Sequence, residues 1–149
     1  MPEVKEEILL TGEFNQVYNL LVDMEQYPEF MSNVKEVNIV KKKEGLQITD
    51  WVTKIEGRDI SWREKDIFHP ESYRIDFKQI EGDLKEFSGY WQLKENSEGI
   101  VVIFKVNFDL GIPGLASFIN PIIKRKLATN AQEMLLAFKN KIEQKVINY

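Results

Sequence analysis

The sequence contains no cysteine and only one histidine, His69, and these two features exclude several kinds of chemistry. Without cysteine there are no disulfides and no thiolate nucleophile. A single histidine also argues against a multi-histidine metal site and against a catalytic triad built on histidine. We therefore expect neither a bound metal nor a cofactor, and His69, which precedes Pro70, is interpreted as a turn residue.

No apolar run is long enough to span a membrane, and the first ten residues, MPEVKEEILL, are too charged for a signal peptide. A cytoplasmic location is the expectation that follows. With 43% hydrophobic and 30% charged residues among 149, the composition is typical of a globular protein. Residues 1–149 are predicted to form a single domain.

Charge is unevenly distributed along the chain, whose net charge is −4. Residues 111–149 carry six basic side chains against two acidic ones, which gives +4 and leaves −8 for the rest. The basic residues are Lys124, Arg125, Lys126, Lys139, Lys141 and Lys145. They form either a solvated outer helix face or a weak contact surface for a membrane or ribosome. No DNA partner is expected, and the oligomeric state is left open.

Hydrophobic periodicity divides the chain into recognisable elements. Strand patterns alternate with turn signals, and two helical segments at 13–24 and 27–31 follow the first strand. The predicted strands are 4–10, 34–43, 46–56, 58–68, 73–81, 84–95 and 100–110. Residues 120–149 read as one long amphipathic helix, with Asn120 as its cap and Pro121 at its first position.

This order predicts an α+β fold in which a seven-stranded antiparallel sheet curves around the long C-terminal helix. Short turns favour pairing of consecutive strands, and a single helix cannot fill the concave face of so broad a sheet. The remaining space is either an aromatic core or a ligand cavity.

Strand alternation predicts which side chains face that space. The predicted cavity residues on the strands are Trp62, Glu64, Asp66, Ile75, Phe77, Gln79, Phe87, Trp91 and Phe104. Those on the helix are Ile123, Leu127, Ala131 and Leu135. Gly89 marks a bend or room for a ligand.

Two features of this face leave alternatives open. Buried carboxylates are costly, so Glu64 and Asp66 are either ligand contacts, hydrated rim residues or partners of a helix lysine such as Lys124, or a bulge shifts the strand parity and they do not face inward. In 46–56 the apolar parity changes, and a bulge between Ile48 and Trp51 would reconcile it.

Four short motifs, in this order, resemble the START-like helix-grip superfamily. They are Tyr27-Pro28-Glu29-Phe30, Trp62-Arg63-Glu64, Gly89-Tyr90-Trp91 and Leu127-Ala128-Thr129-Asn130. Within that superfamily the chain is similar to the polyketide cyclase/dehydrase and lipid-transport group, which includes coenzyme Q-binding proteins and a ribosome-association toxin. The resemblance implies a deep apolar cavity between the sheet and the C-terminal helix.

The resemblance also bears on catalysis. By hand alignment, the cavity arginine of the aromatase/cyclases falls at Asp66, a neighbouring hydroxyl at Glu64 and a tyrosine at Val34. None of those side chains is present, which disfavours the cyclase chemistry, although Glu64 or Asp66 with a raised pKa could still act as a base.

Three functional hypotheses follow. The first is a non-enzymatic binder or carrier of a hydrophobic molecule, either lipid-like, quinone or polyketide/aromatic. The second is a cyclase or dehydratase, with Glu64 and Asp66 as its weak catalytic candidates. The third is an interaction protein that acts through the basic C-terminal helix on a ribosome or membrane surface.

Overall fold

The structure, a computed structural model, describes residues 2–55, 57–109 and 116–147. Its elements in chain order are β1 (Glu3–Leu10), α1 (Phe14–Val22), the short 3-10 helix η1 (Met24–Gln26), α2 (Tyr27–Phe30), β2 (Val34–Lys43), β3 (Leu46–Ile55), β4 (Arg58–His69), the 3-10 helix η2 (Pro70–Ser72), β5 (Arg74–Gly82), β6 (Glu86–Asn96), β7 (Gly99–Asp109) and α3 (Ala116–Ile147). The predicted strands and the two short helices after the first strand are confirmed.

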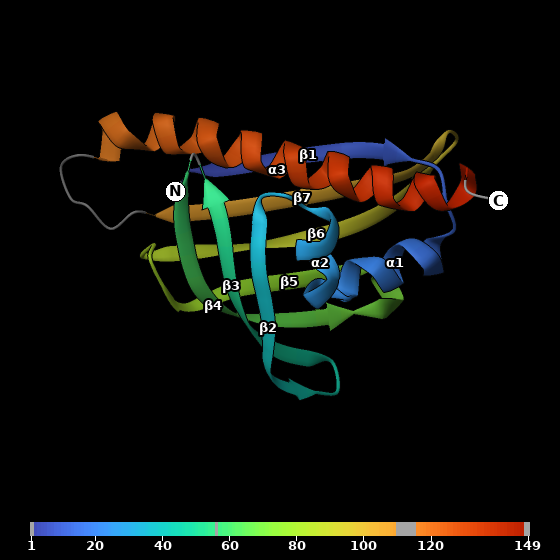
Figure 1. Cartoon of the computed structure of the whole chain (residues 1–149), viewed down its shortest axis with the longest axis horizontal. Coiled ribbons are helices and arrows are strands. Elements are labelled where there is room, and N and C mark those ends of the chain that lie inside the picture. The colour runs from blue at the N-terminus through green and yellow to red at the C-terminus, as the bar shows by residue number, and fades with distance from the viewer. Residues whose placement is uncertain (1, 56, 110–115, 148–149) are drawn as a thin grey trace.

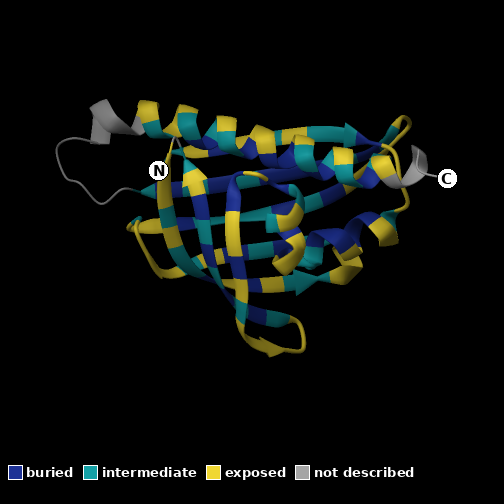
Figure 2. Ribbon diagram, viewed as in Figure 1, coloured by how far each residue is buried: buried dark blue, intermediate teal, exposed yellow. Residues whose placement is uncertain are grey.

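The strands form one antiparallel sheet in the order β1-β7-β6-β5-β4-β3-β2. Only the first strand leaves sequence order, because β1 pairs with β7 at the far edge. The sheet curves strongly, and α3 lies across its concave side (Figure 1). Buried residues line that inner side, while exposed residues alternate with them along the strands (Figure 2). The predicted α+β helix-grip architecture is therefore correct.

Helix α3 is fixed along the edge strand β1 by polar contacts in addition to its apolar face. The Nζ atom of Lys139 donates to the carbonyl oxygen of Leu9 at 2.8 Å, and the Nε2 atom of Gln132 donates to Glu6 Oε1 at 2.8 Å. The buried side chains of the helix are Leu127, Ala131, Met134, Leu135, Phe138 and Ile142. Because the helix follows β1, the part of the concave face that belongs to β3 and β4 is less completely covered.

The helix begins at Ala116, upstream of the predicted cap at Asn120, and Pro121 lies inside it. The prediction from the Asn-Pro pair was therefore wrong about the start. Proline is favoured at the first helical position because its missing N–H is not needed there. Near a helix end it removes one internal hydrogen bond, and here the helix continues through it.

Strand β3 contains no bulge, contrary to the prediction. Its register with β4 runs unbroken from the Leu46–Ile67 pair to the Ile55–Arg58 pair, and the irregularities lie in β2 and where β4 meets β5. The parity changed because polar side chains face inward on this strand. The buried residues of β3 are Gln47, Thr49, Trp51 and Thr53.

Gly89 lies where β6 approaches β7 closely. A Cβ atom at this position would stand 1.8 Å from the carbonyl oxygen of Lys105, far inside van der Waals contact. The space beside Gly89 is therefore filled by the backbone of β7, so this glycine leaves no room for a ligand. Its role is to permit close packing of two strands.

Candidate functional site

Aromatic side chains from five neighbouring strands form a continuous wall on the concave face of the sheet. Trp51 of β3 stacks on Trp62 of β4 with ring centroids 5.6 Å apart and an interplanar angle of 9°. The wall continues through Trp62–Phe87 (5.0 Å), Phe87–Phe77 (5.7 Å), Phe77–Phe104 (5.7 Å) and Phe104–Trp91 (4.4 Å). Such flat, rigid surfaces bury much apolar area and suit contact with a planar or apolar ligand.

Tyr27, from the short helix α2, closes one end of this wall. Its ring lies 5.7 Å from Trp51 and 6.1 Å from Trp91, both in edge-to-face geometry. Its hydroxyl donates to the backbone carbonyl of Leu21. Burial, together with the nearby carboxyl groups of Asp66 and Glu64, raises the pKa of the Tyr27 hydroxyl well above its ordinary value. Tyr27 is thus neutral, and its hydroxyl is already occupied by the hydrogen bond to Leu21.

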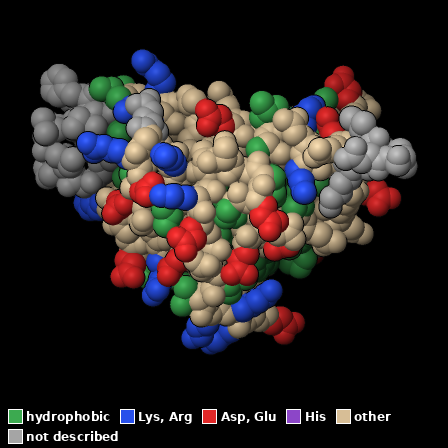
Figure 3. Space-filling view, in the orientation of Figure 1, with side chains coloured by type: hydrophobic (Ala, Val, Ile, Leu, Met, Phe, Trp, Pro, Cys, Tyr) green, Lys and Arg blue, Asp and Glu red, His purple; other side chains and the backbone are tan. Residues whose placement is uncertain are grey.

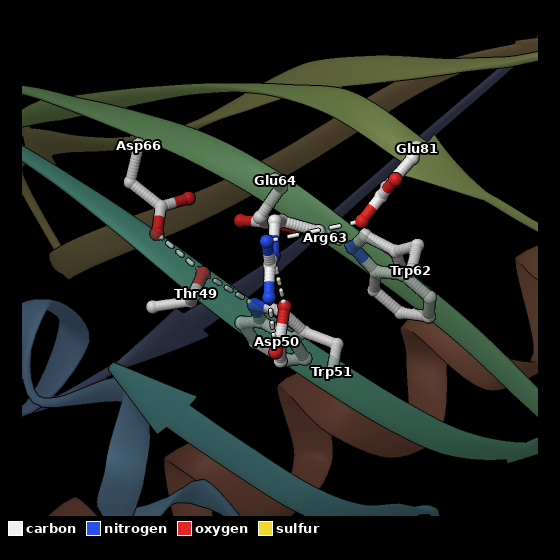
Figure 4. Close-up of polar contacts among 8 residues, drawn as sticks. All are labelled: Thr49, Asp50, Trp51, Trp62, Arg63, Glu64, Asp66 and Glu81. Atoms are coloured by element: carbon white, nitrogen blue, oxygen red, sulfur yellow. Dashed lines mark hydrogen bonds and ion pairs between the residues drawn. The ribbon is translucent and has the colours of Figure 1, made fainter. Parts of the chain in front are cut away.

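A buried polar cluster interrupts the aromatic wall at Asp66, which is fully buried. Its Oδ2 atom accepts hydrogen bonds from Thr49 Oγ1 at 2.8 Å and from Gln47 Nε2 at 3.1 Å. The Thr49 hydroxyl oxygen in turn accepts from Trp51 Nε1 at 2.9 Å. Among the described residues the Asp66 Oδ1 atom has no donor. One face of the carboxylate is therefore satisfied and the other faces Glu64 (Figure 4).

Glu64 lies two residues before Asp66 on β4, so both side chains point to the same side of the sheet. It is 3% exposed, and its Oε1 atom accepts from Trp62 Nε1 at 2.6 Å. Burial raises the pKa of Glu64 well above its ordinary value, and the adjacent Asp66 carboxylate raises it further. Both causes favour the neutral, protonated form of Glu64.

Arg63, the residue before Glu64, points to the opposite, outer face of the sheet. It forms a two-pronged contact with Asp50, with distances of 2.7 Å and 3.0 Å, and lies 3.8 Å from Glu81 (Figure 4). The hydrogen bonds from Arg63 lower the pKa of the Asp50 carboxyl group. This arginine cannot neutralise the buried acids, because the sheet lies between them.

Two adjoining spaces lie between the aromatic wall and α3. The inner space measures about 30 Å³ and the outer one about 250 Å³. The inner space is lined by Trp51, Thr53, Trp62, Glu64, Phe77, Phe87, Trp91, Phe104, Val106, Leu127, Asn130 and Met134. The outer one is lined by Thr53, Ile55, Arg58, Ile60, Trp62, Gln79, Leu84, Phe87, Ile123, Lys126, Leu127 and Asn130. The inner space holds about one or two waters, so aromatic side chains fill most of the deep cavity that the resemblance implied.

The opening of the outer cavity is held by two amide side chains. The Nδ2 atom of Asn33 donates to the backbone carbonyl of Asn130 at 3.0 Å, and its own backbone carbonyl accepts from Lys54 N at 2.8 Å. These bonds link α3 to β3. On the other side, Gln79 Nε2 donates to the carbonyl of Leu84 at 2.6 Å and fixes the β5–β6 turn. The Asn33 contact therefore ties α3 to the sheet, whereas the Gln79 contact is confined to the β5–β6 turn.

Most of the predicted cavity residues lie on these walls. The inner space contains Trp62, Glu64, Phe77, Phe87, Trp91, Phe104 and Leu127, and the outer space adds Gln79 and Ile123. The other four, Asp66, Ile75, Ala131 and Leu135, line neither space. Asp66 is held behind Glu64 by its hydrogen bonds, and the other three are packed core residues. Ala131 leaves no ligand space, because the residues around it close over it.

The structure adds wall residues that strand alternation missed. Trp51 and Thr53 were missed because the parity of β3 was ambiguous. Ile55, Arg58, Ile60 and Leu84 lie near strand ends, where alternation is a poor guide to direction. On α3, Lys126, Asn130 and Met134 were missed because the prediction followed a single helical stripe.

No lysine, arginine or histidine lies on the wall of the inner space within the described part of the chain. Lys124, the partner considered for the two acids, is exposed. The described residues also contain no group of three or more His, Cys, Asp or Glu side chains able to hold a metal ion. In the same residues, no helix combines the length and apolar character that crossing a bilayer requires.

Residues 12–135 match the family described as polyketide cyclase / dehydrase and lipid transport, and the chain belongs to this family. The resemblance inferred from the four sequence motifs is thereby confirmed. A comparison with curated protein sequences found no match.

Solved structures confirm the fold. The chain is similar to TTHA0849 from Thermus thermophilus (22% identity, TM-score 0.89, covering 97% of this chain and 99% of that one). It is also similar to the Zhui aromatase/cyclase from Streptomyces sp. R1128 (16% identity, TM-score 0.89, covering 97% of this chain and 95% of that one). A START superfamily protein from Mycobacterium smegmatis matches at 16% identity with a TM-score of 0.76, covering 95% and 97% of the two chains. At these identities the likeness establishes a START-like fold.

Proposed function

We propose that the protein binds a small, largely apolar molecule between the sheet and α3 and acts as its carrier. The observation that carries this proposal is the partly open outer cavity of about 250 Å³, which includes Trp62 and Phe87 of the aromatic wall in its lining. Membership of a family that includes lipid-transport proteins supports it.

The chemistry of the walls limits what the ligand can be. The apolar residues of the outer cavity are Ile55, Ile60, Leu84, Ile123 and Leu127, together with the rings of Trp62 and Phe87. Arg58 and Lys126 are the cationic residues on this wall. Together the two spaces are slightly smaller than a typical ligand pocket of roughly 300–1,000 Å³. They suit a compact aromatic or lipid-like molecule, or one end of a longer molecule, whose polar group lies toward Arg58 and Lys126.

Glu64 gives the inner space one polar contact. A neutral carboxylic acid can donate a hydrogen bond to a carbonyl, quinone or phenol oxygen, and the space of about 30 Å³ accommodates such an atom. A ligand that carries an uncharged oxygen at its inner end is therefore favoured over a pure hydrocarbon. The same group would disfavour an anionic end at this position.

A fluorescence titration tests the proposal. Anilinonaphthalene sulfonate, an apolar aromatic dye with one anionic group, should bind saturably to the wild-type protein. The variant Leu127→Trp places a bulky ring in both spaces and should weaken dye binding about tenfold or more, a loss of about 1.4 kcal/mol. Leu136→Trp is the matched control, because Leu136 is on the same helix and 52% exposed.

The outcome is interpretable only for folded variants. Ile123→Trp fills the outer cavity from a half-buried position and serves as a second variant if Leu127→Trp unfolds. Equal dye affinity in the wild type, both cavity variants and the control would show that the dye binds elsewhere. Absence of saturable binding by the wild type to the dye and to apolar competitors would reject the carrier function.

Glu64 supports a second candidate function, acid catalysis in the same cavity. A dehydratase needs a group that protonates a leaving hydroxyl, and a carboxyl group whose pKa is raised can supply that proton. If the protein dehydrates poly-ketones, Glu64→Gln should abolish turnover while ligand affinity changes little. Equal turnover by wild type and variant would reject this role.

A further inference from the structure

A basic face surrounds the opening of the outer cavity and is built from two segments that are distant in the sequence. One is the end of the β3–β4 hairpin, and the other is the part of α3 that starts at Pro121. We call it the mouth face, defined by Lys54, Arg58, Ile122, Lys124, Arg125 and Lys126. A groove of about 220 Å³ joins the segments, with Lys54 on one side and Ile122, Arg125 and Lys126 on the other. The groove shares Ile55, Lys126 and Asn130 with the outer cavity.

The mouth face is positively charged although the chain carries a net charge of −4. Lys54, Arg58, Lys124 and Arg125 are all exposed. Figure 3 shows Lys and Arg side chains gathered at the end of the molecule where α3 begins. The acids nearest in sequence compensate only in part, because Asp59 pairs with Lys35 at 2.9 Å.

One acid lies in the groove of the mouth face. Glu133 lines the groove together with Arg125 and Lys126 of the same helix. The groove is lined by one carboxylate, Glu133, and by three cations, Lys54, Arg125 and Lys126, so its net charge is positive. Such a local patch attracts an anionic surface even when the whole molecule repels it.

The mouth face also exposes an apolar side chain where the ligand would have to enter. Ile122 is 53% exposed, and the next residue, Ile123, lines the outer cavity. An exposed isoleucine surrounded by lysine and arginine is the combination by which peripheral proteins contact a lipid surface. The cations bind headgroups, and the apolar side chain enters the acyl boundary. A nucleic-acid surface would use the cations but leave the isoleucine without a role.

We propose that the mouth face docks the protein on an anionic lipid bilayer, with the opening of the outer cavity directed at the membrane. This arrangement lets an apolar molecule pass between bilayer and cavity without crossing water. Docking depends on the surface alone, so it is separable from ligand binding in the cavity.

Co-sedimentation with lipid vesicles tests the docking. The wild type should bind vesicles of phosphatidylglycerol in phosphatidylcholine, should not bind phosphatidylcholine alone, and should dissociate as salt is raised. The triple variant Lys54→Gln/Lys124→Gln/Arg125→Gln should bind about a hundredfold more weakly, because each cation near an anionic surface contributes about fivefold.

The chain provides a matched control for this variant. Lys41, Lys42 and Lys43 are exposed at the β2–β3 hairpin, which lies at the other end of β3 from the mouth face (Figure 1). The variant Lys41→Gln/Lys42→Gln/Lys43→Gln removes the same charge and should bind vesicles like the wild type. Equal losses in both triple variants would overturn the proposal, since only total charge would then matter.

Two further measurements decide what the mouth face binds. Ile122→Asn should weaken vesicle binding at constant charge, and Leu127→Trp, which fills the cavity, should leave it unchanged. Binding of the wild type to polyuridylate RNA in the same buffer, with no binding to anionic vesicles, would reject the membrane and identify a nucleic-acid surface. If vesicles bind but the dye does not, the docking holds and the carrier function fails.

Discussion

Replacing Glu64 with glutamine should stabilise the protein increasingly as pH rises above about 5. Glutamine resembles the neutral acid in shape. Its amide oxygen can accept from Trp62 Nε1, as Glu64 Oε1 does at 2.6 Å, and its amide nitrogen can donate to Asp66 Oδ1, which lacks another donor in the described structure. The substitution therefore keeps the buried contacts and removes only the titration.

The sign follows from the direction of the pKa shift. Glu64 has a raised pKa in the folded protein and titrates at about 4.3 in the unfolded chain. Between these two values the folded state holds one more proton, so the free energy of unfolding falls as pH rises. The contribution is fully present below the unfolded pKa and is lost by the time pH exceeds the folded pKa. Within this window the slope approaches about 1.4 kcal/mol per pH unit.

Urea unfolding followed by tryptophan fluorescence at several pH values between 5 and 8 measures the effect (about one pH unit apart, so that each step reports up to about 1.4 kcal/mol). The difference in unfolding free energy between Glu64→Gln and wild type should grow with pH and level off above the folded pKa. Glu44→Gln, at an exposed position in the β2–β3 turn, is the control and should run parallel to wild type. A pH-independent difference for Glu64→Gln would refute the reasoning, because Glu64 would then titrate alike in both states.

Three further substitutions test the packing around the site, each by urea unfolding. Asp66→Ala should destabilise by about 2–4 kcal/mol, because it leaves the Thr49 hydroxyl and a buried amide without their acceptor; a loss below about 0.5 kcal/mol would mean that the cluster contributes little. Gly89→Ala should lower the free energy of unfolding by about 3 kcal/mol or more, since its Cβ would collide with β7. Ser88→Ala should leave that free energy nearly unchanged, and equal effects of the two substitutions would contradict the close approach of β6 and β7. Phe138→Ala should cost about 3–5 kcal/mol through the cavity it leaves under α3, and a surface-like value would show that the helix is not packed there.

The fold could be predicted from the sequence because its signals are local and repeated. Each strand alternates over several residues, the turns carry glycine or proline, and the long helix has a continuous apolar stripe from Leu127 to Ile142. Errors arose where one signal stood alone. The Asn-Pro pair misplaced the start of α3, and the polar inward face of β3 was mistaken for a change of parity.

The site was predictable to a smaller extent. Alternation placed Trp62, Phe77 and Trp91 on the inner wall, because a period of two fixes the face of a strand. It could not show that Asp66 lies behind Glu64, since that arrangement depends on hydrogen bonds from Gln47 and Thr49 on the neighbouring strand. Cavity size was equally out of reach, because it depends on how the aromatic rings pack against one another and on the position of α3 relative to β1.

The buried acids illustrate why the remaining space matters for function. Sequence reasoning left open whether Glu64 and Asp66 were hydrated, paired with lysine or directed at a ligand. In the structure Asp66 is satisfied by the protein on one side, whereas Glu64 lines the inner space. A neutral acid at the inner end of an apolar cavity is a polar contact for the ligand that we propose, and it requires no cation nearby.

Native mass spectrometry tests the central claim most directly. After incubation with a mixture of quinones, fatty acids and aromatic ketones, the wild-type protein should carry one bound apolar molecule that is released on denaturation. Leu127→Trp should appear only at its bare mass, and Leu136→Trp should keep the bound molecule. A wild-type protein that remains at its bare mass with every compound, while folded, would contradict a ligand-binding function for this cavity.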